Sequence, residues 1–138
     1  MAPPYLEVRA DYDERTIVVY QAYRPEIGLH AADLGAFGAG FSFSRMTWIK
    51  PNFLWMMFRS GWGTKVAQEV TLAIRMRRAG FDALLREAVQ SSFDERSGGT
   101  EADWHCALKA STVRLQWDPD HDPSGAPIQR RAIQLGSP

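Results

Sequence analysis

Hydrophobic and polar positions alternate along several segments of the chain with the period of two that is typical of β-strands. β-Branched and aromatic residues dominate TIVVYQAY, residues 16–23, which predicts a strand. The preceding YLEVRA, residues 5–10, alternates apolar and polar side chains and predicts a short partner strand. Three further strands are expected at EVTLAIRM (69–76), STVRLQWDPD (111–120), which ends in an acidic turn, and IQRRAIQLG (128–136).

Other segments carry the spacing and the terminal residues of helices. Pro25 and Pro51 suit the first turns of two helices, one over residues 25–37 and one that ends at Gly61. Residues 53–58 are apolar on every side, which predicts that the second helix is buried all round. Two more helices are expected over 102–111 and over 79–93, whose apolar face holds Phe81, Leu84, Leu85 and Val89.

The order of these elements indicates the fold class. Strands and helices do not alternate strictly, which favours an α+β fold over a doubly wound sheet. A chain of 138 residues is long enough to bury one sizeable core. We therefore expect a single domain over residues 1–138, with a mixed or antiparallel sheet packed around the buried central helix.

The charge balance limits the classes of partner. The chain has 16 Lys and Arg and 16 Asp and Glu, which argues against a protein that coats nucleic acid or anionic membrane through bulk charge. The distribution is uneven, however, because seven Lys or Arg lie between residues 45 and 78, where Glu69 is the one acid. The sequence therefore allows a local basic site in this region.

Cysteine usage and apolar runs indicate the compartment. The single cysteine, Cys106, rules out an intramolecular disulfide and is predicted to be a small buried hydrophobe. The N-terminus lacks the apolar core of a signal peptide, and no apolar run approaches the roughly 20 residues of a membrane helix. A soluble, cytoplasmic protein with no membrane partner is expected.

Residues 118–123, DPDHDP, bring three aspartates close to His121. Oxygen-rich turns of this kind can hold calcium or magnesium. The glycine and the distal glutamate of a calcium loop are missing, and aspartate and proline are common turn residues. We therefore predict a turn here and assign no metal ligands.

The segment RMTWIKPNFLWMMFRSGWGTK, residues 45–65, combines basic, hydroxyl and aromatic side chains. Arginine offers forked donors suited to phosphate, lysine a point charge, and tryptophan a flat face on which a base can stack. The alternative is that the aromatics are core and the basic side chains only reach the surface on long stems. As a binding site for a nucleotide or single-stranded nucleic acid, the candidates are Arg45, Thr47, Trp48, Lys50, Arg59, Trp62 and Lys65.

Two glutamines lie among apolar strand residues. Gln21 shares one strand face with Val19 and Tyr23, and a buried amide there needs a dedicated hydrogen-bond partner. The alternative is an edge-strand residue that points to water. Gln134 raises the same question on the last expected strand, beside two arginines.

At the level of longer motifs, the chain resembles a family of bacterial and fungal domains of unknown function. The resemblance is carried by VYQAYRPEIG, RMTWIKPNFLWMMFRSGWGTK, QE-x-x-LAI and VRLQWDPDHD…RAIQLG, and it covers residues 5 to 136. Members of this family usually continue past the I-Q-L-G strand into a further amphipathic helix, so the resemblance implies that this chain lacks that helix.

In outline, the order of elements also resembles small ADP-ribosyltransferases, which break the glycosidic bond of NAD through an oxocarbenium-like state. This resemblance implies NAD as the cofactor and Gln21 as the ribose anchor, with Trp48 or Trp62 against the nicotinamide. Arg45, Lys50 or Arg59 would bind the pyrophosphate. The late glutamate of these enzymes is absent, and Gln134 stands nearby, so Gln21 and Gln134 are the catalytic candidates.

Three hypotheses follow for the function. The first is a nucleotide-binding protein, as an ADP-ribosyltransferase-like enzyme that uses NAD. The second is a non-catalytic module that binds nucleic acid or a nucleotide, and the third is a structural or interaction domain in which residues 45–65 are core. The absence of a placed general base or nucleophile counts against the enzyme. The concentration of basic and aromatic residues counts against a purely structural role.

Overall fold

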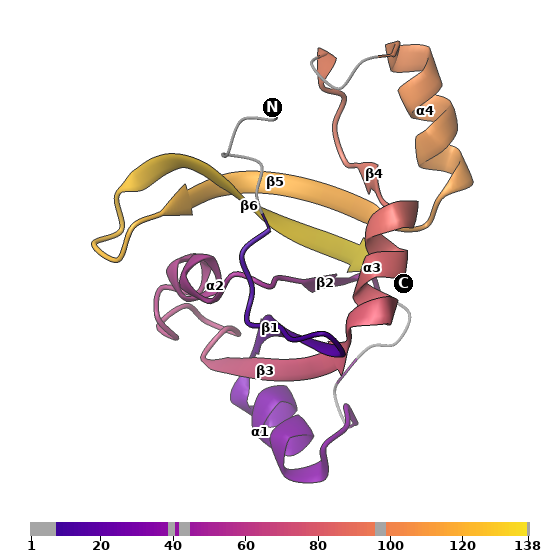
Figure 1. Cartoon of the computed structure of the whole chain (residues 1–138). Coiled ribbons are helices and arrows are strands. Elements are labelled where there is room, and N and C mark those ends of the chain that lie inside the picture. Colours follow the sequence, from indigo (N-terminus) through magenta and orange to yellow (C-terminus); the bar gives the residue numbers. More distant parts are fainter. Residues whose placement is uncertain (1–7, 39–40, 42–44, 96–98, 138) are drawn as a thin grey trace.

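A computed structural model describes residues 8–38, 41, 45–95 and 99–137, with the backbone alone at 129 and 130 (Figure 1). Within these residues the chain forms four helices and six strands. In chain order they are β1 (Thr16–Tyr23), α1 (Pro25–Leu34), β2 (Thr47–Ile49), α2 (Phe53–Arg59), β3 (Val70–Arg77), α3 (Arg78–Glu87), β4 (Val89–Gln90), α4 (Glu101–Ala110), β5 (Arg114–His121) and β6 (Pro127–Ser137).

The strands form two sheets. β1 and β3 form an antiparallel pair with Thr16 opposite Arg77, and β2, β6, β5 and β4 form a four-stranded sheet in that order. Within the second sheet the β4–β5 pairing is parallel and the other two pairings are antiparallel. The single α+β domain expected from the sequence is therefore confirmed, with sheets that are mostly antiparallel.

A backbone bridge joins the two sheets at Tyr20 of β1 and Lys50, the residue after β2. The Tyr20 N–H donates to the Lys50 carbonyl at 2.7 Å, and the Lys50 N–H donates to the Tyr20 carbonyl at 3.3 Å. We call this bridge the seam. It places the second half of β1 beside β2, although the two strands belong to different sheets.

The hydrophobic core lies between the two sheets. Its fully buried members are Ile17 and Val19 of β1, Phe81 of α3, and Ile133 and Leu135 of β6. The β5–β6 hairpin crosses above the β1–β3 pair in Figure 1, with α2 on one side of the core and α3 on the other. Helix α1 covers the outer side of β3, and α4 packs on β4, where the Trp104 indole N–H donates to the Gln90 carbonyl at 2.8 Å.

Most element predictions hold, and the differences are local. The strand over 16–23 and the helix start at Pro25 are confirmed, but α1 ends at Leu34 because Gly35 adopts φ 70°. The helix expected over 79–93 ends at Glu87, since the next residues leave it to pair with β5 as β4. Residues 5–7 of the expected partner strand lie outside the described residues, and 8–10 form no strand.

The prediction that the helix around residues 53–58 is buried all round is wrong. Trp55 and Met56 are buried, but Phe53 is 47% and Phe58 is 41% exposed. With only seven residues, α2 turns one face to the core and leaves the other outside. The exposed rings are covered partly by neighbours: Phe53 makes an edge contact with Tyr20, and Phe58 stacks on the His121 ring.

Two further expectations need correction. The acidic segment is not a turn at Asp118, because pairing with β6 carries β5 through to His121, and the turn begins at Asp122. Cys106 is exposed rather than buried, since α4 has no buried residue. As for membranes, none of the helices in the described part of the chain has the length and apolar character needed to cross one.

Candidate functional site

Two adjoining hollows form a groove at the seam. One, of about 360 Å³, lies between the end of β1, the start of α1 and the segment around β2; the other, of about 700 Å³, lies between α2 and the β5–β6 hairpin. Ala22, Arg45, Trp48 and Lys50 line both hollows, so we treat them as one space and call it the basic groove. Other lining residues include Gln21, Tyr23, Thr47, Arg59, Gln116 and Gln134.

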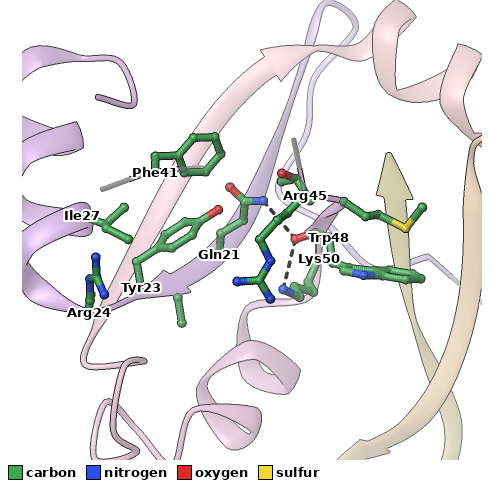
Figure 2. A pocket seen from close by; sticks show the side chains of 11 residues that line it. Gln21, Tyr23, Arg24, Ile27, Phe41, Arg45, Trp48 and Lys50 are labelled. Atoms are coloured by element: carbon green, nitrogen blue, oxygen red, sulfur yellow. Dashed lines mark hydrogen bonds between the residues drawn. The ribbon is translucent and has the colours of Figure 1, made fainter. Parts of the chain in front are cut away.

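The backbone carbonyl of Trp48 organises one wall of the groove (Figure 2). The Gln21 Nε2 and the Lys50 Nζ each donate a hydrogen bond to this oxygen at 3.0 Å. Gln21 is 3% exposed, so its amide has the dedicated partner that a buried glutamine requires. The strand face predicted from the sequence is therefore correct, and the edge-strand alternative is excluded for Gln21.

Four cations line the basic groove, and one of them, Arg24, lies 3.7 Å from Glu26. Arg45 and Arg59 are exposed, which leaves their guanidinium groups accessible, whereas Lys50 is half-buried. Burial, and to a lesser extent the Arg59 guanidinium, lower the pKa of the Lys50 ammonium from 10.5 to about 8, while Asp118 opposes the shift. Like charges gathered in one hollow repel each other unless an anion binds between them, so this arrangement is typical of an anion site.

The β5 and β6 strands supply an uncharged polar wall. Gln116 and Gln134 are directly opposite each other in the antiparallel register, so both side chains lie on one face of the sheet. The Gln116 Nε2 donates to Asp118 Oδ1 at 2.9 Å, and the Gln134 Nε2 donates to Asp118 Oδ2 at 2.8 Å. Gln116 and Asp118 are not among the site residues predicted from the sequence. Strand alternation beyond residue 117 was the signal that could have found Asp118.

Trp48 lines the groove beside β6, and its indole ring extends away from Gln21 and Tyr23 (Figure 2). The ring lies against the backbone of Gly136, which is opposite Trp48 in the β2–β6 pairing. A Cβ added to Gly136 would lie only 2.8 Å from Cε2 of the indole, so the close approach requires glycine. In this position Trp48 is a wall of the groove rather than a member of the buried core.

The structure brings most of the predicted site residues together and leaves two apart. Trp62 is 58% exposed, has φ 56°, and contacts Phe53 on the outer side of α2; neither it nor Lys65 lines the basic groove. The third tryptophan of the segment, Trp55, is core, as the alternative interpretation held. The candidates that do line the groove are Gln21, Arg45, Thr47, Trp48, Lys50, Arg59 and Gln134.

Helix α2, which carries Arg59, is tied to β5 by Asn52. The Asn52 Oδ1 accepts a hydrogen bond from the Trp55 N–H and caps the helix, and its Nδ2 donates to the fully buried Asp120 carboxylate, both at 3.0 Å. Asp120 therefore has a structural role. No group of three or more His, Cys, Asp and Glu side chains is placed to hold a metal ion among the residues that the structure describes.

The buried charge of Lys50 leads to a stability prediction. The unfolded chain keeps this proton up to about pH 10.5, whereas the folded chain releases it near 8, so the charged form opposes folding at neutral pH. This unfavourable contribution is full below pH 8 and disappears as the pH rises to 10.5. Lys50→Met should therefore raise the free energy of unfolding at pH 7 by about 1–3 kcal/mol in urea titrations.

The matched control is Lys65→Met, because Lys65 is exposed and lies outside the groove. It should leave the free energy of unfolding within about 0.5 kcal/mol of the wild type. Repeating both titrations at pH 10.5 should remove the advantage of Lys50→Met. A Lys50→Met variant that is less stable than the wild type at pH 7 would show that the ammonium stabilises the fold.

Comparison with known proteins gives the family of the chain and little else. No curated protein and no solved structure matches it. The outline resemblance to ADP-ribosyltransferases therefore has no support from these comparisons. The resemblance to a family of domains of unknown function is confirmed. Over residues 7–138 the chain matches the family described as Domain of unknown function (DUF4291), and it belongs to that family.

Proposed function

We propose that the chain binds a nucleotide in the basic groove, with NAD as the ligand. The observation that carries this proposal is the convergence of Arg45, Lys50 and Arg59 on one hollow that is also lined by two tryptophans and three glutamines. Phosphates are the natural partners of such a set, because arginine binds them with two parallel hydrogen bonds and lysine adds a point charge. A half-buried lysine that opposes folding is better explained by ligand binding than by structure.

The remaining side chains of the groove suit the other parts of a nucleotide. The Trp48 indole offers an aromatic surface for a base or a nicotinamide ring. The Gln21 amide donates its N–H to the Trp48 carbonyl, and its own oxygen lies on the side of Tyr23 and Phe41 in Figure 2. That oxygen can accept a hydrogen bond from a ribose hydroxyl.

Within this proposal, an ADP-ribosyltransferase-like reaction is the enzymatic form. Gln21 and Gln134 would contact the ribose whose glycosidic bond to nicotinamide breaks, since both line the groove. A glutamine amide is neither an acid nor a base at neutral pH, so these two residues would bind and orient the sugar rather than transfer a proton. A non-catalytic nucleotide module is the second candidate, and it is favoured by the same cations without requiring a reaction.

Thermal unfolding with and without ligands tests the proposal. NAD or ADP-ribose at about ten times its dissociation constant should raise the Tm by roughly 4 °C, because a ligand that binds only the folded state stabilises it by mass action. Arg59→Ala should leave the Tm without ligand nearly unchanged, since the side chain is exposed, and should abolish most of the shift. Unfolding of Arg59→Ala in the absence of ligand would assign Arg59 to the structure instead.

The control variant is Lys109→Ala, which removes an exposed cation on α4, far along the chain from the groove residues. It should keep the full ligand shift. ATP and a short single-stranded RNA complete the ligand set. A shift with RNA alone would favour the nucleic-acid module over NAD. No shift with any of the four would contradict nucleotide binding and return residues 45–65 to a structural role.

A further inference from the structure

Asp118 holds the amides of Gln116 and Gln134, which line the basic groove, in one orientation. Gln116, Asp118 and Gln134 lie on the same face of the β5–β6 pairing, and each carboxylate oxygen of Asp118 accepts a hydrogen bond from a different glutamine. Within the described residues Asp118 forms no ion pair with Lys50 or Arg59. Its two oxygens are therefore directed to the amides rather than to the cations of the groove.

This arrangement decides which atoms of the glutamines remain for a ligand. An ionised carboxylate only accepts hydrogen bonds, so each amide must turn its NH₂ group toward Asp118. With its NH₂ group bonded to Asp118, each amide leaves its Oε1 atom outside that hydrogen bond. Among the described residues neither Gln116 nor Gln134 has another hydrogen bond at its amide oxygen. The wall formed by β5 and β6 therefore presents two hydrogen-bond acceptors.

We propose that Asp118 is a positioning residue that makes this wall select the hydroxyl groups of a ribose, so that the groove takes ribonucleotides in preference to their deoxy counterparts. The inference rests on the proposed function and specifies its ligand. Hydroxyls donate to the two amide oxygens, while the phosphate attached to the same sugar contacts the cations Arg45, Lys50 and Arg59. A site built to hydrogen-bond a hydroxyl discriminates against a ligand that lacks it, because its acceptors are left unpaired.

Isothermal titration calorimetry at pH 6.5, where Lys50 is protonated, provides the test. The probes are ADP-ribose, its two analogues that each lack the 2-hydroxyl of one ribose, and inorganic pyrophosphate. For the wild type, loss of one of the two hydroxyls should weaken binding by about tenfold. Asp118→Asn can donate as well as accept, so the glutamine amides are free to turn over, and the discrimination should fall below about threefold.

Pyrophosphate separates this role from a structural defect. Asp118→Asn removes a negative charge near the cations and should bind pyrophosphate as tightly as the wild type or more tightly, whereas a damaged groove would bind every probe more weakly. Gln116→Met removes one acceptor without a change of charge and should also lose the discrimination. If Asp118→Asn does not fold, Gln116→Met alone tests whether the two amides select the ribose hydroxyls. Asp122→Asn makes the same chemical change in the exposed turn of this hairpin and should keep the wild-type ratio.

The outcomes are distinct for the two proposals. Binding of ADP-ribose with discrimination that survives in both Asp118→Asn and Gln116→Met overturns the role of Asp118 and leaves nucleotide binding intact. Equal binding of ADP-ribose and both deoxy analogues by the wild type also overturns the role of Asp118 and leaves nucleotide binding intact. Absence of binding by ADP-ribose and pyrophosphate overturns both the inference and the proposed function. Loss of discrimination with retained pyrophosphate binding supports both.

Discussion

Trp55→Ala will lower the free energy of unfolding by about 3–5 kcal/mol, which is the range for a buried aromatic side chain replaced by alanine. Trp55 is 4% exposed and lies in α2 between β1 and β5. Its replacement leaves a cavity that the short helix cannot close, because the Asn52 side chain holds the start of α2 at β5. Urea titration followed by circular dichroism measures the change.

Trp62→Ala is the matched control for this experiment. It removes the same side chain, three residues past the end of the same helix, from a position that is 58% exposed. The expected change is within about 1 kcal/mol, since little apolar surface returns to water. Similar losses for the two variants would contradict the assignment of Trp55 to the core and of Trp62 to the surface.

The second large effect is expected at Gly136. A methyl group there would lie 2.8 Å from Cε2 and 2.9 Å from Cδ2 of the Trp48 indole, and 2.9 Å from the Met46 Sδ. The indole cannot yield by rotating a flexible tip, so Gly136→Ala must push the ring away from β6 or spread the β2–β6 pair. We expect a loss of about 1–3 kcal/mol in the free energy of unfolding, as for overpacked cores.

The same substitution should weaken ligand binding, because Trp48 lines both halves of the basic groove and its carbonyl orients Gln21 and Lys50. The thermal shift with ADP-ribose measures this effect. Gly80→Ala is the control with the opposite expected sign. Its added methyl group would meet only the Met76 Cε, at 3.8 Å, and alanine favours the α3 helix by up to about 1 kcal/mol. A neutral Gly136→Ala would mean that the indole is free to move.

Local patterns in the sequence were sufficient for the elements whose formation depends on their own residues. The β-branched and aromatic residues of 16–23 predicted β1, and Pro25 marked the start of α1, whereas the burial of Gln21 was one of two alternatives left open. The basic residues Arg45, Lys50 and Arg59 line one hollow, and they come from one short stretch of chain.

Long-range pairing explains what the sequence could not give. β1 pairs along its whole length with β3, more than 45 residues away, whereas the segment just before it contributes a bridge between Tyr12 and Ile17. Nothing in the composition of either strand specifies β3 as the partner. Asp118 was assigned to a turn because Asp and Pro are turn formers. Pairing with β6 keeps it in a strand beside Gln116, and only that register brings its carboxylate to Gln134.

At the seam, the backbone and the side chain of Lys50 contact different parts of the molecule. The N–H and carbonyl of this residue join the two sheets through Tyr20, while its ammonium group enters the basic groove. The fold therefore requires from position 50 only a main chain that can donate and accept, which every residue except proline supplies. A change of side chain at position 50 can therefore alter the charge of the groove without altering how the sheets are joined.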